Sequence, residues 1–278
     1  MDSGFFYPYH RNIEDQKILT MIKNRQFSLI LLIWLPLLLP AQKSTNRPTK
    51  NGTDPTEPRT RIDINIAEAQ FISSGDLFAT RVNGDFAFTD WISVGMGVPY
   101  YYAALPSATV SGIGDISVGF LLSFMDKNNK DLFQSIAFGF DMSLSSGDPE
   151  SGTGLGQYIA IPYLAAAFYP ADDIMVAPII QEYYSFGKDA GDRRLNEMSF
   201  RIRNVLSTED GHWLAFSPEV IIDYEGIYRT RYMIRTSLGY MFDSNWAISG
   251  DFVAHLLGDE RFSSIGRFNL RYLFTSTN

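Results

Sequence analysis

The residues between Gly112 and Tyr169 alternate between apolar and polar side chains over runs longer than an ordinary soluble strand. The polar turn 126–131 and the loop 145–156 interrupt this stretch and leave three runs, 115–124, 132–144 and 158–169. Successive side chains of a strand point to opposite faces, so each run has one apolar and one polar face. Strands of about a dozen residues, joined alternately by a short turn and a long loop, are typical of a transmembrane β-barrel.

The same alternation begins at Arg61 and continues to Phe274. In the last run, aromatic residues share one face while Arg267 and Arg271 share the other. An arginine that faces lipid at mid-bilayer costs roughly 2–4 kcal/mol, so we expect the aromatics toward lipid and the arginines toward the lumen. The run 174–184 is apolar on both faces, which leaves its register open. A soluble β-sandwich also alternates, but its strands are usually only about five or six residues long.

These runs predict an all-β fold, a transmembrane antiparallel up-and-down β-barrel of about 12 strands. We expect the barrel to span residues 61–274 and a tail to follow at 275–278. The connections predict short turns on the periplasmic side and longer outer loops at 103–111, 145–156 and 185–194. Barrels of about eight strands are filled by side chains and those of about sixteen enclose a wide channel, so a narrow or gated pore is expected.

The N-terminal part predicts export. Lys23 and Arg25 precede the apolar run 27–39, which has the length of a secretory h-region and is shorter than a membrane span. We interpret residues 1–41 as a signal peptide, with Met21 as an alternative start; a buried or anchoring helix is the competing interpretation. Residues 42–60 have almost no apolar side chains and predict a disordered periplasmic lead-in. Together with the barrel, this places the protein in the outer membrane of a Gram-negative bacterium.

Composition excludes several functional classes. The chain has no cysteine, which rules out disulfides, thiolate metal sites and cysteine nucleophiles. A net charge of -8 argues against a nucleic-acid surface, for which clustered positive charge is expected. Charged residues make up 19% and the mean hydropathy is -0.07, too polar for a bundle of membrane helices. We therefore expect neither a metal nor a cofactor, and no nucleic-acid partner.

The loop 145–156 is rich in glycine and opens a strand. A phosphate-binding loop would open a helix and carry a following Lys-Ser/Thr, so a nucleotide site is not expected here. We interpret the segment as an extracellular loop. Its characteristic residues are Gly147, Asp148, Gly152, Gly154 and Gly156.

The polar faces of the predicted strands carry charges of both signs. Buried charges must pair or stay hydrated, so one interpretation is a structural salt-bridge network across the lumen. The functional interpretation is a polar constriction that selects solutes. The predicted lumen-lining residues are Arg81, Asp85, Asp115, Asp141, Arg201, Arg203, Glu219, Asp223, Arg231, Arg235, Asp251, Arg267 and Arg271.

Three motifs carry a resemblance to a known family. Gly112-Ile113-Gly114-Asp115 is followed by Ser146-Gly147-Asp148-Pro149, by the Gly-rich stretch 152–156 and by a return strand with Pro162. In these motifs the chain resembles the outer-membrane barrels of the meta-pathway phenol-degradation family, although Ser145-Ser146 stands where that family usually has Pro-Thr. The resemblance implies passage of small hydrophobic or aromatic compounds through the outer membrane.

The sequence thus predicts a passive channel and not an enzyme. Extracellular loops would capture the solute, and the lumen or a lateral gap would conduct it. Expected partners are membrane lipids, lipopolysaccharide, the barrel-assembly machinery and a small-molecule solute. One alternative is a plugged structural or adhesive barrel. Another is a hydrolase with Asp223, Asp251 and His255 gathered at the outer rim.

Overall fold

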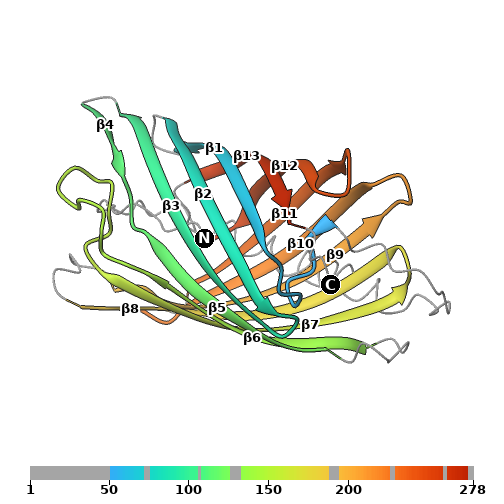
Figure 1. Ribbon diagram of the computed structural model, residues 1–278. Helices are drawn as coiled ribbons and strands as arrows, with labels where there is room; N and C mark the ends of the chain where they lie inside the picture. Colours follow the sequence, from blue (N-terminus) through green and yellow to red (C-terminus); the bar gives the residue numbers. More distant parts are fainter. Residues whose placement is uncertain are drawn as a thin grey trace.

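The computed structural model of the chain describes residues 51–71, 76–105, 108–125, 133–187, 194–225, 229–258 and 262–274. These residues form antiparallel strands joined by turns and loops (Figure 1). Within the described ranges, no helix is long and apolar enough to cross a membrane. The strands are β1 (Arg61–Phe71), β2 (Asp76–Thr89), β3 (Ile92–Leu105), β4 (Ala108–Ile113), β5 (Ser117–Met125), β6 (Phe133–Ser143), β7 (Tyr158–Ala171), β8 (Ile174–Phe186), β9 (Asn196–Ser207), β10 (His212–Asp223), β11 (Arg229–Met241), β12 (Trp246–Leu257) and β13 (Phe262–Leu273).

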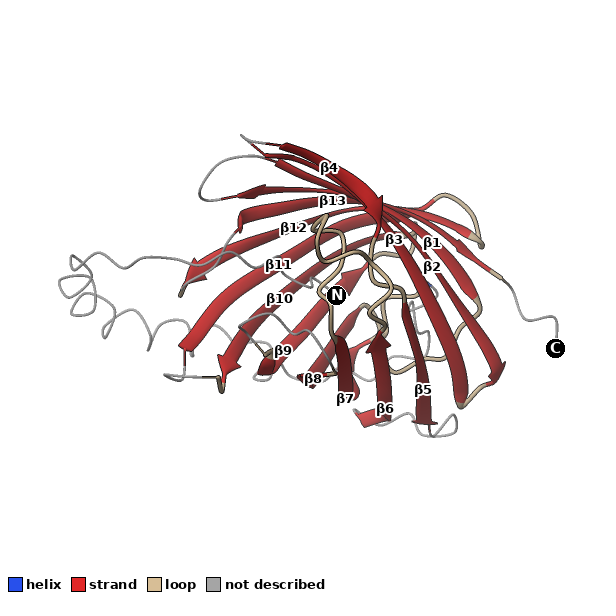
Figure 2. Cartoon of the chain, turned by 90° about the vertical axis from the view of Figure 1, so that its left-hand side faces the viewer, coloured by secondary structure: helices blue, strands red, loops and turns tan. Residues whose placement is uncertain are grey.

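The strands close into a ring, because β1 pairs with β13 on one side and with β2 on the other. β3 pairs with β2 along one edge. Its other edge is shared, since β4 pairs with residues 100–105 and β5 with residues 92–97. The described part of the sheet has 13 strands. Because β4 and β5 follow one another along the same edge of β3, they count as one strand of the barrel, and the closed barrel has twelve strand positions (Figure 2). The predicted all-β barrel is confirmed.

The two ends of the barrel differ. At one end the N–H of Phe274 donates to the carbonyl oxygen of Thr60 at 3.0 Å, and short turns join the strands at 90–91, 172–173, 208–211 and 242–245. We call this the terminal end. The loop 144–157 lies at the opposite end, which we call the loop end. This arrangement of short turns matches the one predicted from the sequence.

Outward and inward side chains alternate as expected for a barrel in lipid. On β2, Val82 and Phe86 face outward and are 48% and 52% exposed. Arg81 and Asp85, which precede them in the sequence, face the interior. On β8, whose register the sequence left open, Met175 and its inward neighbours are buried, and Ile180 and Tyr184 are exposed on the outside. The outer surface is therefore an apolar band around a polar interior.

A charge placed on this apolar band should destabilise the barrel. Val82 lies in the middle of β2 and is 48% exposed on the outer face. We expect Val82→Arg to cost about 2–4 kcal/mol of folding free energy in bilayers, because the guanidinium would face hydrocarbon. Denaturant titration of the variant in lipid vesicles measures this cost, with Val82→Thr as the control. An unchanged unfolding midpoint for Val82→Arg would contradict the outward assignment of this face.

The wall is interrupted between β4 and β5. The run predicted at 115–124 corresponds to β5, and the motif 112–115 that precedes it contains the break between β4 and β5, which pair with the same edge of β3. Gly114 lies so close to β3 that a Cβ there would be 2.1 Å from a ring carbon of Tyr101. The loop predicted at 103–111 is wrong, because β3 extends to Leu105 and β4 pairs with it from Ala108. Backbone proximity to Tyr101 explains why glycine stands at the break.

Two apolar layers fill parts of the interior. Trp213 is 3% exposed and lies across β11, where a Cβ on Gly239 would be 2.0 Å from its ring. A tryptophan at the terminal end thus faces inward because the neighbouring strand offers a glycine. The terminal-end layer consists of Met175, Ala177, Val205, Trp213, Ala215 and Ala247. The loop-end layer consists of Ala69, Leu77, Ala103, Ile221, Met233, Val253 and Ile265.

Candidate functional site: the lumen

Residues 51–60, which we call the plug segment, precede β1 and fold back into the barrel. Asn51, Thr53, Asp54 and Thr56 are buried, and Thr56 is 0% exposed. We expected a disordered lead-in at 42–60; the structure instead gives residues 51–60 a defined path, and residues 42–50 lie outside the described ranges. The signal peptide predicted at 1–41 also lies outside them. The segment closes part of the lumen at the terminal end.

Hydrogen bonds from several strands hold the plug segment. Nη1 of Arg271 donates to the carbonyl oxygens of Asn51 and Gly52, each at 3.0 Å. Nη1 of Arg61 donates to the same Gly52 oxygen at 3.0 Å. The contacts therefore use the peptide oxygens, which any residue at these positions would supply.

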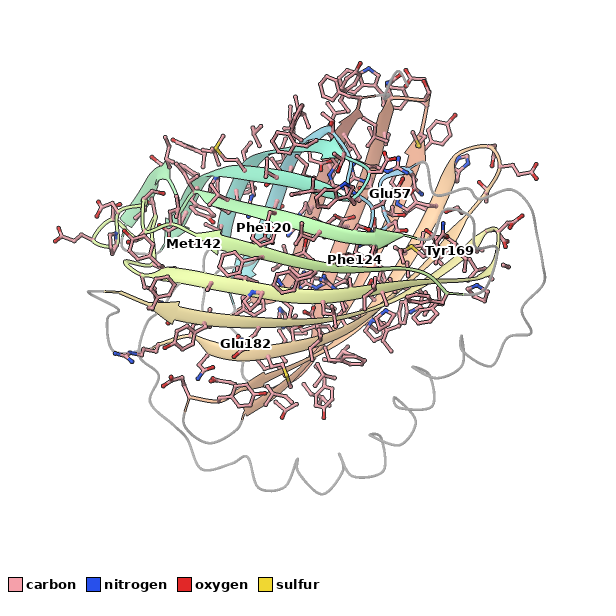
Figure 3. The ribbon with its side chains drawn as sticks, turned by 60° about the horizontal axis from the view of Figure 1, so that its bottom comes forward. Glu57, Phe120, Phe124, Met142, Tyr169 and Glu182 are labelled. Atoms are coloured by element: carbon pink, nitrogen blue, oxygen red, sulfur yellow. The ribbon has the colours of Figure 1, made fainter. Side chains whose placement is uncertain are left out.

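Side chains of the plug segment reach the opposite wall. The Tyr169 hydroxyl on β7 donates to Oδ2 of Asp54 at 2.6 Å, and the hydroxyls of Thr56 and Ser135 on β6 are 2.6 Å apart. Figure 3 shows Glu57 and Tyr169 toward the end of the barrel at which Phe124 lies, away from Met142. Because β13 and β1 hold the peptide oxygens while β6 and β7 hold the side chains, the segment spans the lumen.

A second segment enters from the loop end. The two carboxylate oxygens of Asp115, at the break between β4 and β5, accept the N–H groups of Gly147 at 2.9 Å and Leu155 at 2.8 Å. Thr153 is 4% exposed and packs against the inward face of Gly112. Asp115 was predicted to line the lumen; it is 7% exposed and holds the loop 144–157 inside the barrel. The loop therefore covers the interior at its own end.

The glycines predicted to characterise this loop have distinct places in it. A Cβ on Gly147 would be 2.7 Å from the Cα of Gly154, so the two strands of the loop cross at glycines. Gly152 and Gly156 have positive φ angles of 75° and 68°. Asp148 is exposed, and its carbonyl oxygen accepts the N–H groups of Thr153 and Gly154 at 3.0 and 3.1 Å. The loop needs glycine for this crossing and for its two left-handed turns.

Beside the plug segment, and lined in part by its residues 52–59, lies a cavity of about 300 Å³. Arginines from β1, β9, β13 and the plug segment line one part of its wall, and carboxylates from β2 and β6 line another. Tyr163, Leu121 and Ile179 add an aromatic ring and apolar surface. The predicted lumen residues that line the cavity are Asp85, Asp141, Arg201, Arg203 and Arg271.

Wall glycines keep this cavity open on the β5–β7 side. Asp141 lies flat over Gly119, where a Cβ would be 1.9 Å from its Oδ1. Tyr163 lies over Gly139 in the same way, with its Cζ 1.9 Å from the position of a Cβ. Because the neighbouring strand has no side chain at these points, polar groups line the wall without filling the space.

Ion pairs organise the wall near β1 and β13. Nε of Arg61 lies 2.7 Å from Asp85 and 3.3 Å from Asp63, and Nε of Arg271 lies 2.6 Å from the other oxygen of Asp63. Arg61 and Asp63 were not among the predicted lumen residues. The alternation that begins at Arg61 places both on the inward face, so the signal was present in the sequence.

The remaining predicted lumen residues lie in a second network and at scattered positions. Glu219 accepts Ser199 Oγ at 2.5 Å and Arg235 Nε at 2.6 Å, and Arg231 pairs with Glu197. Glu197 was not predicted. Among the others, Arg81 donates to Asn83 at 2.6 Å and to Ser117. Asp251 accepts a hydrogen bond from Asn269 at 2.5 Å and lies opposite Arg267 in the register of β12 and β13. Asp223 accepts the N–H of Glu225 at 2.9 Å.

The residues of the rim site proposed for a hydrolase, Asp223, Asp251 and His255, lie on β10 and β12. A base such as His255 would be oriented by a carboxylate, and Asp251 and Asp223 were the two candidates. Asp251 contacts Asn269 on β13, and Asp223 caps the backbone N–H of Glu225. These two hydrogen bonds link each carboxylate to the structure around it.

Comparisons with known proteins place this geometry in context. Residues 45–194 match the family model for the MetA-pathway of phenol degradation, and no curated protein matches the sequence. The outer membrane channel from Pseudomonas putida F1 is similar with a TM-score of 0.63 at 10% identity, over 83% of this chain and 100% of that chain. The NanC porin has a TM-score of 0.54 at 12% identity, and the KdgM porin 0.50 at 17%; each match covers 77% of this chain and 99% of the porin.

These identities are low, so the solved structures establish the fold alone. The family match covers more than half of the 278 residues. It also contains the break at 112–115 and the loop 144–157, on which the resemblance seen in the sequence rested. The chain therefore belongs to the MetA-pathway of phenol degradation family, and it has the fold of outer-membrane channels.

Proposed function

We propose that this protein is a passive channel for small hydrophobic or aromatic molecules in the outer membrane of a Gram-negative bacterium. The observation that carries the proposal is the cavity beside the plug segment, inside a closed barrel whose interior also holds an apolar layer toward each end. The loop end would face outward and the terminal end the periplasm, as the short turns indicate. The channel lies in contact with lipid along its apolar band.

The size of the cavity suits a small solute. Its volume is about 300 Å³, and an engineered protein cavity of about 150 Å³ already accommodates benzene. Tyr163 and Leu121 provide surface against which a ring can pack. The loop-end layer, with Leu77 and Met233, is a barrier that costs less to cross for a molecule with apolar surface than for a hydrated ion.

The route through the loop-end layer can be tested by blocking it. Ala103 points inward in this layer and is 6% exposed, whereas its neighbour Tyr102 points outward and is 45% exposed. We expect cells that produce the protein to take up the hydrophobic dye N-phenyl-1-naphthylamine several-fold faster than cells without it. Ala103→Trp should return uptake to background because the indole would fill the layer, and Tyr102→Trp should leave uptake unchanged. Both barrels are first checked for folding by heat-modifiable gel mobility.

The same geometry also supports a second function, that of a plugged structural or adhesive barrel. The plug segment and the loop both occupy the interior, as a plugged structural or adhesive barrel requires. Folded wild-type protein that gives no dye uptake in cells and no current in planar bilayers would favour this alternative and end the channel proposal.

A further inference from the structure

Arg203 lines the cavity, and among the described residues no carboxylate forms a hydrogen bond with it. It lies on the inward face of β9, two residues from Arg201 and opposite Ala177 of β8. Its Nε is buried without a hydrogen-bond partner. Arg201, Arg271 and Arg61 are close enough to repel its charge. A guanidinium held among other cations is stabilised by water or, more strongly, by a negative partner.

The carboxylates near this cluster are already engaged. Asp85 and Asp63 pair with Arg61 and Arg271, and Glu57 pairs with Arg59 at 2.6 Å. Asp54 accepts the hydroxyl of Tyr169. Asp251 attracts Arg203, but its Oδ2 accepts Asn269 at 2.5 Å.

Asp141 is the remaining carboxylate of the cavity, and it lies on another wall. It is on β6, folded over Gly119 of β5, and its charge acts on Tyr163 and Asp85. The cavity thus has a positive side at β9 and β13 and a negative side at β6.

We propose that the cavity binds a small organic acid, with its carboxylate at Arg203 and its apolar or aromatic part against Tyr163, Leu121 and Ile179. This inference rests on the proposed channel function and adds the charge of the solute to it. A carboxylate is planar and matches the donors of a guanidinium, and several converging cations bind it without needing further protein groups. The apolar layers on both sides select for the remainder of the molecule.

Binding is tested with a charged and a neutral probe of the same shape. Refolded full-length protein in detergent is titrated by isothermal calorimetry with benzoate and with benzamide. We expect benzoate to bind at least about tenfold more tightly than benzamide, because the charge-assisted contact is lost in the amide. Arg203→Met should weaken benzoate binding by about tenfold or more, and Arg203→Lys should restore part of it.

Two further variants make the test specific. Arg194→Met removes the same charge from an exposed position before β9 and should leave benzoate binding unchanged. Asp141→Asn should strengthen benzoate binding, because it removes the negative charge of the opposite wall. Equal binding of benzoate and benzamide, or an effect of Arg194→Met as large as that of Arg203→Met, would overturn the inference.

The same variants separate this inference from the channel proposal. Normal dye uptake in cells with no preference for benzoate would reject the acid site and leave the channel in place. Benzoate binding that depends on Arg203, in a barrel that passes neither dye nor current, would retain the site and reject the channel.

Discussion

Removal of residues 51–57 of the plug segment should raise the single-channel conductance at least about threefold, because this part of the chain spans the lumen. A refolded chain that begins at Pro58 lacks the peptide oxygens bound by Arg271 and Arg61 and the side chains bound by Tyr169 and Ser135. The ion pairs of Arg61 and Arg271 with Asp63 remain, so the barrel should still close. Planar-bilayer recording measures the change.

A chain that begins at Lys50 is the matched control, since it keeps the whole plug segment.

The plug segment can also be fixed to the wall, because the hydroxyls of Thr56 and Ser135 are 2.6 Å apart and the chain contains no other cysteine that could compete. Thr56→Cys together with Ser135→Cys should form a disulfide under oxidising conditions and lock the plug. If the chain from Pro58 conducts no better than the chain from Lys50, the segment does not limit the pore.

Loss of the Asp115 carboxylate should release the loop 144–157. Asp115 accepts two backbone N–H groups from a buried position, at 2.8 and 2.9 Å. Hydrogen bonds to a charged group contribute roughly 1.5–3 kcal/mol each, and we expect Asp115→Ala to weaken loop closure by about 3 kcal/mol in total. The open population would then rise roughly 100-fold. Cleavage after the exposed Glu150 by a glutamate-specific protease, followed by mass spectrometry, reports this population.

The turn 242–245 supplies the control. Oδ1 of Asp243 also accepts two backbone N–H groups, from Asn245 at 2.7 Å and Trp246 at 2.6 Å, but this turn is exposed at the other end of the barrel. Asp243→Ala removes the same kind of contact and should leave the cleavage rate at Glu150 unchanged. A loop that stays protected in Asp115→Ala would mean that the packing of Thr153 against Gly112 suffices to hold it.

Local alternation was enough to predict the barrel and the orientation of its wall. A period of two determines which residues face lipid, and the cost of lipid-facing arginine fixes the register of β13. The same parity places Arg203 and Asp141 inside. The pattern also places Arg61 and Asp63, at the start of the first run, on the inward face.

Contacts that depend on the closed ring could not be read from the sequence. Arg271 holds a carbonyl oxygen 219 residues earlier in the chain, and a backbone acceptor leaves no trace in residue type. The plug segment consequently resembled an unstructured lead-in. The strand break at Gly114 had a signal in its glycines, but its meaning depended on the ring of Tyr101 on the neighbouring strand.

The bond network of Arg271 also bears on biogenesis. Arg271 lies on the last strand, its carboxylate partner Asp63 lies on the first, and its Nη1 binds the plug segment. Contacts so distant in the chain form late, because the loop between them must close first. We therefore expect the pairing of β1 with β13 and the insertion of the plug segment to occur in the same late step of assembly.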